Sequence, residues 1–391
     1  MPRCRDVEVS EDDLRGFRYF EMLRPLLHKL HSDGTKRDRA GNRKLFYDQY
    51  VTLLLLYYFS PALTSLRALE QATGLGKTQD RLGIGPVSRS AFGEAAHVFD
   101  PALLRALVVA LAGQTLPRLP KSGAKELAGL VAVDGSLLPA LPRMAWALWQ
   151  SPTHRAAKAH VAFEVLRGVP VDATVTAGSG PERPQWRAMV KAGGFYVVDR
   201  GYADYSLYRE LDAMPCRFIG RLQENAVYEV LRERELTEEA RGAGVVRDVE
   251  IRRLGTEKHN PLLARPMRIV IVERAGPRPG DPAQQWVLAT NDPELTADLV
   301  KIAYQYRWKV ELFFRWLKCI LGCRHLLSLC QAGVEMQVYA ALIATLLIAA
   351  RTGLKPTKRT FEMVCHYFSG WATIEELDGH IEARRAKEAP S

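Results

Sequence analysis

The chain has 391 residues and a formal net charge of +10, from 54 Lys and Arg against 44 Asp and Glu. This length exceeds that of one ordinary compact domain and predicts a multidomain protein with ample chain to bury a core. The positive excess favours a polyanionic partner but does not separate DNA from RNA or an acidic membrane. Six cysteines without a disulfide framework, and no signal-peptide pattern, predict a reducing compartment, by default the cytoplasm.

The first part of the chain, residues 1–125, is expected to form a helical domain. Apolar clusters recur there at helical spacing, and Ser88 and Ser90 are candidate N-caps of a helix running toward Val98. Five cations fall within nine residues of this part: Lys36, Arg37, Arg39, Arg43 and Lys44. Such a cluster is either a solvated loop or a contact with the DNA backbone. The domain is therefore a candidate for DNA binding.

After residue 126 the sequence pattern becomes typical of strands. Apolar runs bounded by turn residues predict strands at Leu130–Val133, His160–Leu166, Pro170–Thr176 and Phe195–Val198, with a helix near Gln185–Lys191 before the last of them. This order is typical of the opening of a ribonuclease-H-like sheet. A β-rich insertion is expected at about 221–283, followed by a buried strand from Trp286. The predicted fold class is therefore α/β, a ribonuclease-H-like core with an insertion of strands.

The last third of the chain is predicted to be helical. A long helix is expected from about Leu295 to Leu321. The longest strongly apolar run, Val338 to Ala350, is about 13 residues, short of the roughly 18 to 20 that a membrane-spanning helix needs. We therefore expect a buried helix there, no membrane partner, and a closing helical region at 353–391.

Three acidic residues stand where metal ligands are commonly found. Asp134 and Asp199 each end a predicted strand and are followed closely by glycine, although a simple turn acid would look the same. Glu311 lies on the long predicted helix. Together they would supply hard oxygen ligands for Mg²⁺ or Mn²⁺. Two such ions about 3.5 to 4 Å apart can promote phosphoryl transfer, which makes these acids candidate catalytic residues.

The predicted helix carries a polar face around Glu311. At about 100° per residue, Tyr304, Arg307, Glu311 and Lys318 fall within an arc of about 60°. Arg307 and Lys318 would then be placed to hold the phosphates of a DNA strand. Alternatively, Arg307 and Glu311 form an ordinary surface pair at i,i+4 spacing.

The spacing Tyr304-x2-Arg307-x3-Glu311-x6-Lys318 resembles the Tyr-Arg-Glu-Lys signature of the insertion-sequence-four family of bacterial DDE transposases. Three more segments look like that family's first-acid, second-acid and pre-glutamate segments: Val133 to Ser136, Val198 to Tyr202 and Trp286 to Asn291. The resemblance covers roughly residues 45 to 350.

What the resemblance implies is a catalytic domain, here placed at 126–352, interrupted by strands before the glutamate. It implies cut-and-paste movement of a DNA element with terminal inverted repeats, with hairpin ends as one route, two bound Mg²⁺ or Mn²⁺ ions, and a homodimer on the DNA. It also implies a bacterial, nucleoid-associated protein in the cytoplasm.

The resemblance suggests three further DNA contacts. Trp286 stands 25 residues before Glu311, near the position of a tryptophan that stacks on a flipped base in hairpin-forming members, but a core tryptophan would fit equally. Lys158 is expected beside Asp134 on the second strand, near phosphate. Arg200, next to Asp199, is a candidate phosphate contact.

Two other functions stay open. A metal-dependent nuclease of the same fold would cut DNA without joining it. A non-catalytic DNA-binding protein derived from a transposase would need none of the three acids, and their presence at Asp134, Asp199 and Glu311 argues against it.

Overall fold

The computed structural model describes residues 45–114, 125–151, 153–276 and 282–388, together with residues 27, 28, 30, 31 and 34. The cation cluster from Lys36 to Lys44 lies outside the described residues, so its DNA contact stays a prediction. The chain divides into two compact units. The helical unit comprises Met1–Pro117, Leu138–Ala157 and Trp316–Ser391, and the sheet unit comprises Arg118–Leu137 and Lys158–Arg315.

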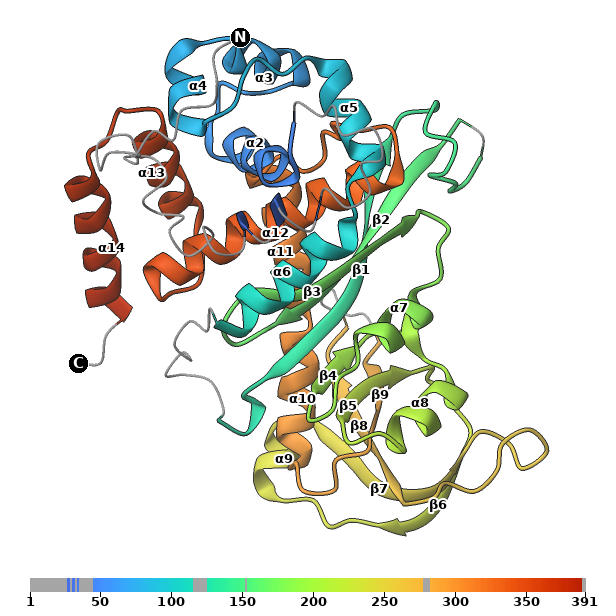
Figure 1. Ribbon diagram of the computed structural model, residues 1–391. Helices are drawn as coiled ribbons and strands as arrows, with labels where there is room; N and C mark the ends of the chain where they lie inside the picture. Colours follow the sequence, from blue (N-terminus) through green and yellow to red (C-terminus); the bar gives the residue numbers. More distant parts are fainter. Residues whose placement is uncertain are drawn as a thin grey trace. The chain divides into compact units, whose positions relative to one another are not determined.

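The helical unit is built around one long apolar helix, α12 (Gln331–Thr352). Figure 1 shows α12 beside α2 and α6, and both of these helices pack against it. Its run from Val338 to Ala349 is buried, as predicted. The described helices of this unit are α2 (Tyr47–Phe59), α3 (Leu66–Thr73), α4 (Gly76–Leu82), α5 (Arg89–Val98), α6 (Pro101–Gln114), α12, α13 (Lys358–Phe368) and α14 (Ile374–Glu388).

The apolar run of about 13 residues underestimates α12, which has 22 residues and is long and apolar enough to cross a membrane by length and composition alone. Within the described residues it is the one continuous helix with the length and composition to cross a membrane. Helices α5 and α6 meet at a bend of 81°, and they would be long enough to cross only if the two were counted as one broken span. In the structure 89% of the apolar window of α12 is buried inside the protein. That burial is what the core helix of a folded unit requires.

Short polar side chains define where the helices of the first part begin. Ser88 caps α5 by accepting a hydrogen bond from the backbone N–H of Ala91, which confirms the predicted start. Ser65 caps α3 in the same way, through the N–H of Ala68. These caps satisfy backbone donors that have no partner within the helix.

Within the residues that the structure describes, the sheet unit contains a mixed sheet of nine strands in the order β3-β2-β1-β4-β5-β9-β8-β7-β6. The strands are β1 (Leu130–Ala140), β2 (Arg155–Glu164), β3 (Val169–Ala177), β4 (Phe195–Val198), β5 (Arg217–Leu222), β6 (Tyr228–Glu233), β7 (Val245–Leu254), β8 (Met267–Arg274) and β9 (Gln284–Thr290). Strand β4 is parallel to β1 and to β5, whereas β9 and the strands beyond it pair antiparallel. The inserted strands therefore extend the same sheet through β9.

Helices cover both faces of this sheet. One face carries a large apolar cluster to which α7 (Glu182–Met189) contributes Trp186 and α8 (Tyr205–Asp212) contributes Tyr208, both fully buried. Helix α10 (Ala297–Tyr306) packs against β4, β5, β7, β8 and β9. Because successive strand residues point to opposite faces, apolar runs such as Phe195–Val198 supply both layers.

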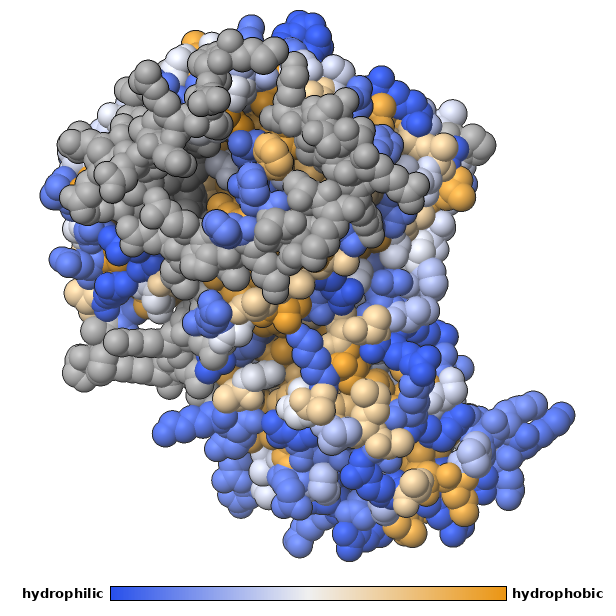
Figure 2. Space-filling model, in the orientation of Figure 1, coloured by the Kyte–Doolittle hydropathy of each residue, from blue (hydrophilic) through white to orange (hydrophobic). Residues whose placement is uncertain are grey.

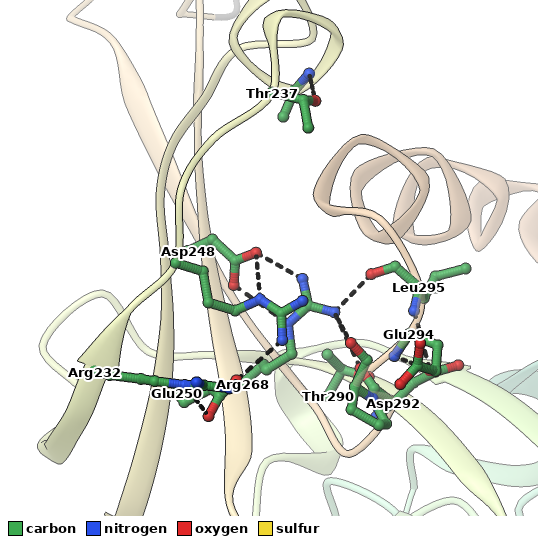
Figure 3. A network of polar contacts seen from close by, with 12 residues as sticks. Arg232, Thr237, Asp248, Glu250, Arg268, Thr290, Asp292, Glu294 and Leu295 are labelled. Carbon is green, nitrogen blue, oxygen red and sulfur yellow. Dashed lines mark hydrogen bonds and ion pairs between the residues drawn. The ribbon is translucent and has the colours of Figure 1, made fainter.

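A buried arginine joins the inserted strands to the segment that leads into α10. Arg268 of β8, 2% exposed, donates to Asp248 of β7 (Nη2 to Oδ2, 2.6 Å). Its Nη1 also donates to the carbonyl oxygens of Asp292 at 3.1 Å and Leu295 at 2.6 Å. Figure 3 shows the guanidinium between Asp248 and the turn that carries these carbonyls. The insertion therefore fixes the start of the helical region that holds Glu311.

Ion pairs join side chains on the outer strands of the sheet. Arg232 forms two hydrogen bonds of 2.7 Å with Glu250, and Arg247 pairs with Glu233. Exposed apolar side chains, among them Val230 and Leu231 of edge strand β6, interrupt this charge. Figure 2 accordingly shows a mostly hydrophilic surface with small apolar groups over the end of the sheet where Figure 1 places β6 and β7. Charges on an edge strand discourage pairing with further strands.

Candidate active site

Parallel pairing of β1 and β4 brings the two aspartates to the same level of the sheet. The register pairs Ala132 with Val197, and Asp134 and Asp199 each lie two residues beyond that pair. Asp199 follows the last residue of β4, as predicted. The expectation that Asp134 also ends its strand was wrong, because β1 continues to Ala140. The side chain of Asp134 is therefore largely enclosed, with 17% of it exposed.

Local hydrogen bonds orient both aspartates. Asp199 is the N-cap of a short 3-10 turn, Arg200–Tyr202, and its Oδ1 accepts from the N–H of Gly201 at 2.8 Å. Asp134 Oδ1 accepts from the N–H of Gly135 at 2.7 Å. In each case one carboxylate oxygen is held by backbone and the other is left for a second partner.

Arg307 connects Asp134 to Glu311. It lies between α10 and α11 (Trp308–Arg315), where the expected long helix is broken. Its Nη2 donates to Glu311 Oε1 at 2.8 Å, and its Nη1 contacts Asp134 Oδ2 at 3.5 Å. The ion pair between Arg307 and Glu311 that was predicted as one alternative is therefore present. It is more than a surface pair, because Arg307 also contacts Asp134.

The charge state of Asp134 reflects this crowded site. Burial raises its pKa to about 7, assisted by the nearby carboxylates of Asp199 and Glu182 and opposed by the Gly135 N–H and the Arg307 guanidinium. A carboxyl whose ionisation is disfavoured by burial and like charges gains from a cation that neutralises them. The donor set of aspartate and glutamate oxygens suits Mg²⁺ or Mn²⁺.

Among the described residues, no group of three His, Cys, Asp or Glu side chains is arranged to hold a metal ion without movement. The Arg307 guanidinium stands between Asp134 and Glu311 and pairs with both carboxylates. These carboxylates fit a divalent ion by their chemistry, provided that the guanidinium turns away from one of them.

Glu182 is a residue of this site that the sequence reasoning missed. It is the first residue of α7, and its Oε1 accepts from Lys158 Nζ at 3.0 Å. Its charge acts on Asp134. The sequence signal for Glu182 was an acid at the start of a helix that follows a strand. Acids are common at the first turn of solvated helices, so Pro181-Glu182-Arg183 did not stand out.

The three predicted basic contacts have different surroundings. Lys158 lies on β2, next to β1 as expected, and pairs with Glu182. Arg200 is exposed in the turn directly after Asp199. Lys318 is half-buried, and burial lowers the pKa of its ammonium.

Lys318 is not on the same regular helix as Glu311. It lies in a π-helical segment, Trp316–Ile320, marked by a hydrogen bond from the N–H of Leu321 to the carbonyl of Trp316. This segment belongs to the helical unit. The predicted arc of about 60° assumed an unbroken α-helix, and wider turns with i→i+5 bonds change the angle per residue. That part of the prediction was wrong.

Aromatic side chains lie next to Arg307 within the sheet unit. Tyr304 is only 6% exposed, so it does not form part of an open polar face as predicted. Its ring meets the half-buried Trp286 of β9 edge to face at 4.9 Å between centroids. The Arg274 guanidinium stands 4.8 Å from the Trp286 ring centroid, and that of Arg307 stands 5.9 Å from the Tyr304 centroid.

Two neighbouring acids have structural roles. Asp204 is the N-cap of α8, accepting from the N–H groups of Ser206 and Leu207. Asp292 is buried, accepts from the N–H groups of Glu294 and Leu295, and pairs with Arg217. Neither carboxylate is available as a substitute for Asp134 or Asp199.

The fold and site define a mixed α/β protein whose sheet, with the helical region after it, gathers an acidic centre. Residues 126–347, more than half of the chain, match the protein family described as Transposase DDE domain. The chain belongs to this family.

Its similarity to known proteins is otherwise modest. It is 29% identical over 245 residues to the provisionally named transposase y4zB of Sinorhizobium fredii, covering 62% of this chain and 65% of that protein. It is also 26% identical over 206 residues to a provisionally named transposase for insertion sequence element IS5377 of Geobacillus stearothermophilus. That match covers 53% of this chain and 52% of the relative. The chain thus matches less than two thirds of each relative's length.

A solved structure also resembles this chain weakly. The piggyBac transposase synaptic complex with hairpin DNA shares 11% identity, with 99% of this chain and 87% of that chain covered, at a TM-score of 0.42.

Proposed function

We propose that this protein is a transposase that cleaves the ends of a DNA element and joins them to target DNA, by a reaction that depends on Mg²⁺ or Mn²⁺. The observation that carries the proposal is that Arg307 links Asp134 to Glu311, and that Asp134 and Asp199 lie at the same level of paired strands, within the stretch that matches the DDE domain. The finer assignments are a ribonuclease-H-like core and membership of the insertion-sequence-four family, supported by the strand order and the Tyr304 to Lys318 spacing.

Each residue of the site has a definite task in this proposal. Asp134, Asp199 and Glu311 would hold two divalent ions, whose chemistry when bound would be activation of the attacking oxygen and stabilisation of the leaving one. Arg307 moves from Asp134 toward a phosphate of the bound strand, since a guanidinium pairs well with either anion. Lys158, Arg200 and Lys318 are proposed phosphate contacts, and Tyr304 supports Arg307 from its buried position.

The proposed partners are the terminal inverted repeats of the element and a target duplex. Net positive charge favours such polyanions and makes binding depend on salt. Joining two ends in one event requires a pair of active sites, so we propose a homodimer on the DNA. A bacterial cytoplasm, at the nucleoid, is the proposed location.

The proposal is tested with the wild-type chain and a duplex that carries one element end. In Mg²⁺ or Mn²⁺ we expect cleavage at the end and covalent joining to a second duplex, both resolved on denaturing gels. In Ca²⁺ we expect binding without chemistry, because its looser coordination suits the in-line geometry poorly. Cleavage without joined product would identify a nuclease, and binding without cleavage in any metal would identify a non-catalytic protein.

We propose that Trp286 stacks on a base of the cleaved end. Replacing it with alanine should slow hairpin formation or resolution by roughly 10- to 100-fold, since such stacking contributes about 1 to 3 kcal/mol. The first nick should change by less than about 3-fold in the same time course. Trp371→Ala, at a side chain 81% exposed in the helical unit, is the control for loss of a tryptophan.

A structural role for Trp286 would give another pattern. Because Trp286 also packs on Tyr304, loss of packing would slow every step equally and lower the melting temperature. That result would assign Trp286 to the core.

A further inference from the structure

The carboxylate of Glu182 lies against the backbone of both catalytic aspartate segments. A Cβ atom built on Gly135 would lie 3.2 Å from Glu182 Oε1, and one on Gly201 would lie 3.2 Å from Oε2. Gly135 directly follows Asp134, and Gly201 donates its N–H to Asp199. The two oxygens of Glu182 therefore reach the two segments that position the aspartates.

Contacts hold Glu182 in this place. Lys158 donates to its Oε1 at 3.0 Å, and only 27% of the Glu182 side chain is exposed. The charge of Glu182 acts on Asp134, and on the buried Tyr202 together with Asp134 and Asp199. Three carboxylates thus share a region of low exposure, which is unfavourable unless cations compensate them.

The space around Gly135 is filled by polar groups. A Cβ there would also lie 3.2 Å from Lys158 Cδ and from His160 Nδ1. His160 is fully buried, and its Nδ1 has no hydrogen-bond partner within the described residues, although Nε2 pairs with Thr176. An unpaired polar atom that is fully buried requires an explanation, and a group bound from outside the protein is one that fits this acidic surrounding.

We propose that Glu182 is a fourth carboxylate of the metal site, and that glycine at positions 135 and 201 leaves room for its two oxygens, because a Cβ at either would press on one of them. The inference rests on the proposed function and adds a ligand-holding residue outside the DDE triad. Acidic groups around a metal increase its affinity directly or by holding bound water, and their loss typically weakens binding about 10- to 100-fold.

The experiment measures Mn²⁺ binding to the full chain by isothermal titration calorimetry, with and without an element-end duplex. Glu182→Gln should raise the Kd for Mn²⁺ about 10-fold, because the amide keeps the shape and can still accept from Lys158 but lacks the charge. Glu210→Gln is the matched control, since this residue of α8 pairs with Arg187 at the surface and should leave the Kd unchanged.

Glycine substitutions test the same idea without changing charge. Gly135→Ala and Gly201→Ala should each raise the Kd for Mn²⁺, because the added methyl pushes Glu182 away by a few tenths of an ångström and, at 201, also presses on Asp199 Oδ1, which lies 3.1 Å from the added Cβ. Gly93→Ala in α5 is the control, since nothing lies within 4 Å of its added Cβ. Melting temperatures recorded in parallel separate local displacement from loss of folding.

The outcomes separate this inference from the proposed function. If Asp134→Asn loses Mn²⁺ binding while Glu182→Gln binds as wild type, the role of Glu182 is overturned and the transposase proposal stands. If neither changes Mn²⁺ binding, the metal site itself is misplaced. Should Glu182→Gln fail to fold, Glu182→Asp keeps the charge on a shorter chain, and unchanged affinity there together with wild-type affinity in Gly201→Ala would refute the proposal.

Discussion

Replacing Asp134 or Asp199 with asparagine, or Glu311 with glutamine, is expected to abolish both cleavage and joining of element ends. The loss should be on the order of 1,000-fold or more, because each substitution removes charge that stabilises the transition state through the bound ions. Residues that act as one unit are strongly non-additive, so the double variant should be little worse than either single one. Cleavage and strand transfer are measured separately, under single-turnover conditions.

Binding of DNA should survive these substitutions. The amides keep nearly the same shape, and removing a negative charge near the phosphates should if anything strengthen binding. Asp204→Asn is a close control, because asparagine also caps helices well, and Asp204 caps α8 and pairs with the half-exposed Arg183. If one of the three variants cleaves at a rate near wild type, that residue does not belong to the catalytic centre.

Replacing Arg268 with methionine is expected to destabilise the sheet unit by about 3 to 5 kcal/mol. The substitution leaves the carboxylate of Asp248, 4% exposed, without its closest cation, whose Nη2 lies 2.6 Å away. It also leaves the carbonyls of Asp292 and Leu295 without the donor that holds the turn before α10. The midpoint of urea unfolding should fall accordingly.

A second arginine on the same strands provides the comparison. Arg232→Met removes an ion pair with Glu250 whose arginine is 69% exposed, and exposed pairs contribute at most about 1 kcal/mol. Adding Asp248→Asn to Arg268→Met should recover part of the lost stability, because the uncompensated charge is then removed. Equal urea unfolding midpoints for Arg268→Met and Arg232→Met would show that the buried network stabilises the protein no more than an exposed ion pair does.

The order of strands and helices could be predicted along the chain because it depends on local patterns. Apolar runs such as Phe195–Val198 give strands, and the β-rich insertion predicted at about 221–283 contains β6, β7 and β8. The candidate acids could be proposed because each stands next to such a run or at a signature spacing. Errors arose where tertiary packing changed local geometry, as in the continuation of β1 past Asp134 and the π-helical turn at Lys318.

The sequence alone shows which residue types stand at the ends of apolar runs and at helical spacing, and these patterns predict a DDE transposase domain and three candidate acids. The tertiary structure alone decided that Arg307 bridges Asp134 and Glu311, that Glu182 lies against Gly135 and Gly201, and that the inserted strands extend one sheet. It also decided that helices from both ends of the chain pack into one unit. Periodicity reports which face of an element is apolar, whereas contacts between residues far apart depend on strand register and chain closure, which local patterns do not encode.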